Sequence, residues 1–143
     1  MAVVIDDRLL LDVLAGQASG AVADELESGG VFTTGAWYYR LGRAAFGGTG
    51  SGALSGRLAS LDRTVADQVR ATLADLPPSI GLLHQRVVVP VMFTLRVRRQ
   101  LNILGAEALA VALLLPARLV VTTDAALLRS AAREMGVEYQ IST

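Results

Sequence analysis

The stretch AVVIDD, residues 2–7, opens the chain with four consecutive apolar residues that end at two carboxylates. A short apolar run of this kind is typical of a strand buried on both faces, as in a parallel sheet. Residues 9–14 then carry leucine and valine at helical spacing. The chain is therefore expected to pass from a buried strand directly into a helix.

The same alternation of strand and helix continues along the chain. Residues 54–76 repeat leucine and valine every three or four positions and predict one long helix. Alternating strands and helices form a parallel sheet covered on both faces. We therefore predict a three-layer α/β/α sandwich of flavodoxin-like topology, in a single domain over residues 1–143 with a Gly-rich loop at 47–52. The central parallel sheet should have four or five strands, and those after the first are expected at 31–34, 87–89, 119–121 and 137–141.

Composition narrows the chemistry that this domain can perform. The chain has 143 residues, no cysteine and one histidine, and all of its 13 cationic side chains are arginines, balanced by 13 acids. These counts exclude disulfides, cysteine zinc sites and a lysine-containing phosphate loop. The longest apolar run, residues 108–115, is too short to span a bilayer, so we expect a cytoplasmic protein without membrane contact.

Three carboxylates are expected at one edge of the sheet. Asp6 and Asp124 directly follow predicted strands, and Glu107 begins an otherwise apolar helix. Ligands of open parallel sheets bind outside the carboxyl ends of the strands. Oxygen ligands select a hard ion, so the three acids predict a Mg²⁺ or Mn²⁺ site. The alternative for Asp6 and Asp124 is helix capping without a catalytic role.

Three segments of the sequence resemble the PIN domain family. They are residues 4–11 (VIDDRLLL), 105–112 (GAEALAVA) and 120–137, which opens with VVTTD and ends with Gly136 and Val137. The resemblance covers the first fifteen residues and about the last fifty. It implies a flavodoxin-like sheet and a metal-dependent ribonuclease, and many members are VapC-type toxins of toxin–antitoxin pairs. On the family pattern, Asp6, Glu107 and Asp124 are the metal-binding and catalytic acids.

The sequence departs from the family pattern at one acid. The family carries a further acid on the helix after the second strand, but no Asp or Glu occurs between Gly29 and Leu61. Arg8, Arg40 and Arg43 are the residues expected to bind substrate phosphates. The leading prediction is a Mg²⁺-dependent ribonuclease, the toxin of a toxin–antitoxin pair, with RNA as substrate, an antitoxin as partner and a homodimeric state. The alternative is a catalytically degenerate PIN-like protein that binds RNA or another protein.

Overall fold

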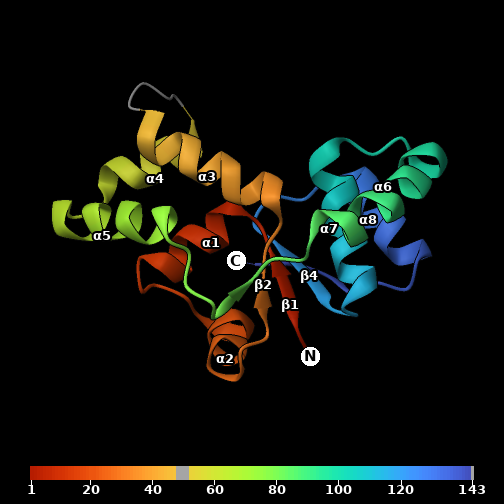
Figure 1. Ribbon diagram of the computed structural model, residues 1–143, viewed down its shortest axis with the longest axis horizontal. Coiled ribbons are helices and arrows are strands. Elements are labelled where there is room, and N and C mark those ends of the chain that lie inside the picture. The colour runs from red at the N-terminus through yellow and green to blue at the C-terminus, as the bar shows by residue number, and fades with distance from the viewer. Residues whose placement is uncertain (48–51, 143) are drawn as a thin grey trace.

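The centre of the molecule is a five-stranded sheet in which every pair of neighbouring strands is parallel (Figure 1). The computed structural model describes residues 1–47 and 52–142, and for residues 96–99 it describes the backbone alone. The strands lie in the order β3-β2-β1-β4-β5. Their bounds are β1 (Val3–Ile5), β2 (Val31–Phe32), β3 (Ile80–Gly81), β4 (Arg118–Val121) and β5 (Tyr139–Ile141).

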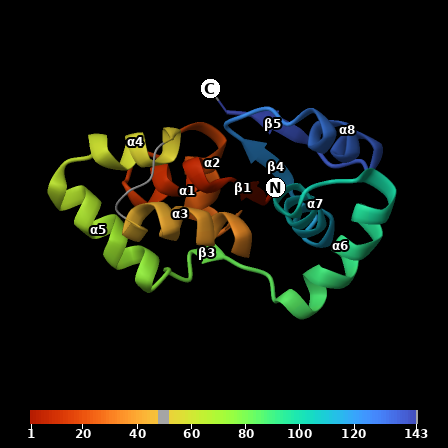
Figure 2. The same cartoon turned by 90° about the horizontal axis from the view of Figure 1, so that it is seen from above.

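Helices cover both faces of this sheet. Viewed from above, α1, α3, α4 and α5 lie on one side of it and α6, α7 and α8 on the other (Figure 2). This arrangement confirms the predicted three-layer α/β/α class with a parallel sheet. The helices in the described part of the chain are α1 (Asp7–Leu14), α2 (Gly20–Ser28), α3 (Gly35–Gly47), α4 (Ala53–Ser60), α5 (Arg63–Ala74), α6 (Gln85–Arg99), α7 (Ile103–Leu114) and α8 (Ala126–Glu134).

The continuous apolar run of β1 supplies side chains to both layers. Val3 and Ile5 pack into the core beneath α1 and α3, whereas Val4 packs into the core beneath α7 and α8. All three side chains are fully buried. Successive residues of a strand point to opposite faces, which is why a strand in the middle layer is apolar throughout.

Local signals in the sequence set the ends of several helices. The Asp6 side chain accepts a hydrogen bond from the Leu9 backbone N–H at the start of α1. The Asn102 side chain does the same for Gly105 at the start of α7. Both are residue types preferred at helix N-caps. Gly136, with φ of 73°, follows α8 in the left-handed region that glycine adopts without strain.

The strand predicted at residues 87–89 is wrong. These three valines lie in α6, where Val88 is buried with Met92 and Leu95 at helical spacing. Packing of this face against the core overrides the strand preference of valine, which is a weak and context-dependent signal. The third strand is instead β3, only two residues long and therefore without a visible pattern in the sequence.

The long helix predicted over residues 54–76 is interrupted. Leu61 adopts an extended conformation and Asp62 precedes the first turn of α5, so the segment forms α4 and α5. Buried side chains of both helices, Leu58 and Val69, join the same core. The apolar spacing therefore identified the buried face correctly and missed the turn within it.

Two further expectations concern the loop and the membrane. The Gly-rich loop predicted at 47–52 lies mostly outside the described residues, since only its ends are included: Gly47 closes α3 and Gly52 precedes α4. Among the described helices, none combines the length and the apolar character required to cross a bilayer.

Candidate functional site

A crevice opens at the carboxyl ends of β1 and β4, where the order of the strands changes direction. From β1 the chain moves outward to β2 and β3, and then returns to the other side of β1 as β4. Helix α1 leaves β1 toward one face of the sheet and α8 leaves β4 toward the other. In open α/β sheets this divergence creates the ligand-binding crevice.

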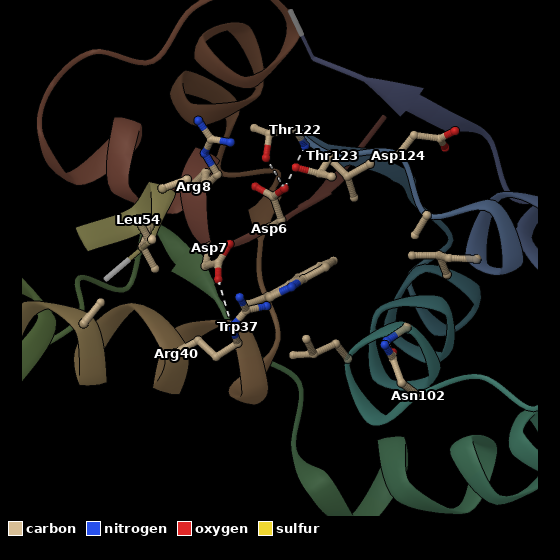
Figure 3. A pocket seen from close by; sticks show the side chains of 18 of the residues that line it. Asp6, Asp7, Arg8, Trp37, Arg40, Leu54, Asn102, Thr122, Thr123 and Asp124 are labelled. Carbon is tan, nitrogen blue, oxygen red and sulfur yellow. Dashed lines mark hydrogen bonds and ion pairs between the residues drawn. The ribbon is translucent and has the colours of Figure 1, made fainter. Parts of the chain in front are cut away.

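Asp6 fixes the floor of this crevice by joining the two strand ends. Its Oδ2 accepts hydrogen bonds from the backbone N–H and the hydroxyl of Thr122, both at 2.7 Å, and its Oδ1 accepts one from the Leu9 N–H at 3.0 Å (Figure 3). The side chain is buried. Three donors therefore compensate the burial of this carboxylate.

Asp7, the next residue, is equally buried but poorly compensated. Its Oδ2 has no hydrogen-bond donor among the described residues and forms an ion pair with the Arg40 Nε, 3.4 Å away (Figure 3). Burial raises the pKa of the Asp7 carboxyl above its ordinary value, and the positive charge of Arg40 only partly opposes this. The two neighbouring aspartates therefore occupy very different environments.

The crevice is a large cavity with a mixed lining. Its volume is about 1270 Å³, and Trp37, Asn102 and Thr123 are part of its wall. All three arginines singled out in the sequence, Arg8, Arg40 and Arg43, line it together with Asp6, Asp7 and Asp124. Arg40 and Arg43 are exposed and Arg8 is half-buried, whereas Asp6 and Asp7 are buried. The guanidinium groups are therefore the charges that a ligand meets first on this side of the cavity.

Glu107 does not line this cavity. Its Oε1 accepts a hydrogen bond from the Ala36 N–H at 2.8 Å, and its Oε2 accepts one from the Gln85 Nε2 at 2.9 Å. The carboxylate thereby holds the first turn of α3 and the first turn of α6 against α7. A side chain at position 35 would press on this contact, because a Cβ there would lie 3.2 Å from the Gln85 Nε2.

Asp124 lies at the rim of the cavity and turns away from Asp6 (Figure 3). It forms an ion pair with Arg129 and accepts a hydrogen bond from the Tyr139 hydroxyl at 3.1 Å. Burial, together with the nearby Asp124 carboxylate, raises the pKa of Tyr139. Ala125 is the N-cap residue of α8 and no side chain caps this helix, so helix capping, the alternative role for Asp124, is wrong.

The three predicted metal ligands do not meet around a common point in this arrangement. Asp6 accepts three internal hydrogen bonds, both oxygens of Glu107 accept N–H groups, and Asp124 is paired with a guanidinium. Within the residues that the structure describes, no three His, Asp or Glu side chains are grouped to hold a metal ion. This donor set, as arranged, does not fit a three-carboxylate magnesium site.

Sequence reasoning missed two polar residues of the site. Thr122 is not among the predicted site residues, and it binds Asp6 across the crevice. Asp7 is not among them either, yet it is buried in the cavity wall. The doubled acid at the end of the apolar run was the available signal for Asp7, because a single cap needs only one of the two.

The chain matches no model of a protein family and no curated protein.

Proposed function

We propose that this protein binds single-stranded RNA in the crevice between α1 and α8, without cleaving it through a metal ion. The observation that carries the proposal is the position of Arg8, Arg40 and Arg43 on one cavity whose acids are buried or paired. Arginine guanidinium groups bind phosphate oxygens in a bidentate manner and supply most of the affinity for a nucleic-acid backbone. The sequence resemblance to PIN domains is the reason for choosing RNA.

The size and shape of the site support a single-stranded nucleic acid as the ligand. Small-molecule pockets measure roughly 300–1,000 Å³, and this cavity, at about 1270 Å³, exceeds that range. A concave site at the end of a sheet admits an extended, unpaired RNA segment, in which phosphates and bases are both accessible. Sequence-specific recognition of RNA is directed mainly at such unpaired segments.

The salt dependence of binding tests the role of the three arginines. Neutralising a phosphate of a single strand contributes about 0.7 to the slope of log K against log salt concentration. Replacing all of Arg8, Arg40 and Arg43 by alanine should therefore reduce the slope by about 2 in fluorescence-anisotropy titrations of a labelled oligoribonucleotide in EDTA. Arg133→Ala, which alters an exposed residue on α8 outside the cavity, is the matched control.

The triple variant and the Arg133→Ala control should differ in RNA binding if the proposal holds. The control should bind RNA with the unaltered slope, and the triple variant should bind weakly at low salt. Equal slopes for wild type and the triple variant would reject the crevice as the RNA site.

A magnesium-dependent ribonuclease is the second candidate function, with a toxin role as its setting. The observation that favours it is the pair of adjacent carboxylates, Asp6 and Asp7, beside a cavity lined by arginines. This candidate requires the carboxylates to exchange their present partners for a Mg²⁺ or Mn²⁺ ion. Cleavage of RNA that requires the added ion and is lost in Asp6→Asn would establish it and would refute binding without cleavage.

A protein partner, either a second copy or an antitoxin, stays a prediction. The exposed aromatic side chains on α3 are the first surface to test: Tyr39 is 68% exposed and Phe46 is 60% exposed. Exposed apolar patches of monomers are often interaction surfaces. Light scattering at micromolar concentration would distinguish a dimer from a monomer.

A further inference from the structure

The Asp7–Arg40 contact offers a hydrogen-bond acceptor and a cation side by side in the wall of the cavity. The Asp7 Oδ2 is 3.4 Å from the Arg40 Nε, but no hydrogen bond joins them. The Asp7 residue is only 6% exposed, and the Arg40 side chain is 53% exposed. The acceptor is therefore buried at the side of the cavity while the guanidinium extends toward solvent.

A buried carboxylate oxygen that accepts no hydrogen bond is costly, even beside a guanidinium, so its presence requires a reason. Buried polar atoms in proteins almost always have a partner, and the exceptions concentrate where a ligand, an ion or a water completes the set. Asp6, one residue earlier, accepts three hydrogen bonds, so the local backbone does not prevent compensation. The Asp7 Oδ2 is therefore a position in this wall at which a ligand can supply a donor that the described residues do not supply.

The chemistry of a ligand that fits this part of the wall follows from Asp7 and Arg40. The Asp7 Oδ2 lacks a hydrogen-bond donor among the described residues, and Arg40, whose Nε forms an ion pair with it, carries further guanidinium N–H groups that can bind an anionic acceptor. In RNA, the 2′-hydroxyl and the 3′-phosphate lie on neighbouring carbons of one ribose, so a single nucleotide presents both groups together. DNA presents the phosphate and lacks the hydroxyl, and the 2′-hydroxyl is the group by which proteins distinguish the two.

We propose that Asp7 accepts a hydrogen bond from a ribose 2′-hydroxyl while Arg40 binds the adjacent phosphate, so that Asp7 is the residue that selects RNA over DNA. This inference rests on the proposed function, because it assigns a role within the same crevice. Asp7 contacts the ligand directly, whereas Arg8 and Arg43 contribute charge without distinguishing the sugar.

Three backbones of one base sequence test the inference by equilibrium binding in EDTA. They are RNA, 2′-fluoro RNA and DNA, in which thymine is replaced by uracil so that only the sugar differs. The fluoro analogue keeps the sugar pucker of RNA but cannot donate a hydrogen bond. Hydrogen bonds to charged groups are among the stronger ones, so wild type should bind RNA about tenfold more tightly than either analogue.

Asp7→Ala removes the acceptor and provides the decisive comparison. This variant should bind RNA and 2′-fluoro RNA with equal affinity, while retaining its dependence on salt through the arginines. Asp12→Ala is the control, since Asp12 lies on the same helix but pairs with Arg57 and does not line the cavity. It should keep the full preference for RNA. Circular dichroism and thermal melting would show that both variants are folded.

The outcomes separate this inference from the function on which it rests. Equal binding of all three backbones by wild type would overturn the role of Asp7 and leave RNA binding in place. A preference for RNA that survives in Asp7→Ala would do the same. Absence of binding to any of the oligonucleotides would overturn the proposed function and this inference together.

Discussion

Two adjacent carboxylates at the end of β1 differ in how the protein compensates their burial. Asp6 accepts three hydrogen bonds and joins β1 to the loop after β4. Asp7 has an oxygen that accepts no hydrogen bond from the described residues and is paired only with the Arg40 guanidinium, at 3.4 Å. One carboxylate of the pair therefore serves the fold, and the other is maintained at a cost to stability beside a cavity.

The largest expected change in stability follows from the loss of the Asp6 side chain. Asp6→Ala leaves three buried or half-buried donors of Leu9 and Thr122 without an acceptor among the described residues. Unmet donors and a lost helix cap together should lower the free energy of unfolding by about 3 kcal/mol. Urea denaturation measures this change, and a loss below about 1 kcal/mol would contradict a structural role for Asp6.

Removal of the Glu107 carboxylate should destabilise the protein, as removal of the Asp6 carboxylate does. Glu107→Ala removes the acceptor of the Ala36 N–H and of the Gln85 amide, and it should lower the free energy of unfolding by about 2 kcal/mol. The loss should be the same in EDTA and in excess Mg²⁺, as measured by urea denaturation in the two solutions. Stabilisation of wild type by Mg²⁺ that disappears in this variant would instead identify Glu107 as a metal ligand.

Asp7→Asn should raise the free energy of unfolding at pH 7, whereas the two preceding variants lower it. Its raised pKa means that the folded state favours the protonated carboxyl, so the contribution of Asp7 to stability is lost as the pH rises through the folded pKa. The amide resembles the protonated form, and the variant should be more stable than wild type at pH 7 by about 1 kcal/mol. The advantage should vanish at a pH below the ordinary value of 3.8. Thermal melts across this range measure it, and a variant less stable than wild type at pH 7 would contradict the comparison.

The smallest effect is expected at the rim. Asp124 pairs with Arg129 in an exposed position, and exposed ion pairs contribute little because water and salt screen them. Asp124→Asn should change the free energy of unfolding by less than about 0.5 kcal/mol. The pKa of Tyr139 should move back toward its ordinary value, because the neighbouring negative charge is removed. Ultraviolet titration of the tyrosines follows the second effect, and a Tyr139 pKa that does not change would contradict the assigned contact.

Much of the fold could be predicted because burial leaves periodic patterns. The apolar run of β1, the leucines of α1 and the almost wholly apolar α7 each reflect the layer in which they lie. The exceptions have physical causes as well. Val87 to Val89 have the composition of a strand but pack as a helix, and the two residues of β3 are too few to show a period.

Only part of the site could be predicted from the sequence. Topology allowed Asp6 and Asp124 to be placed at one edge of the sheet, and the cavity includes both, together with all three arginines. The partners of each carboxylate could not be predicted, because they come from distant segments: Glu107 bonds to Ala36, and Asp6 bonds to Thr122. These contacts decide whether a carboxylate holds the fold together or is free for a ligand.

An NMR titration of the labelled protein with a short single-stranded RNA in EDTA would locate the RNA site residue by residue. We expect the largest amide shift changes at Asp7, Arg8, Arg40 and Arg43, around the crevice, without any metal ion. Shift changes confined to another surface, or none until Mg²⁺ is added, would contradict this expectation.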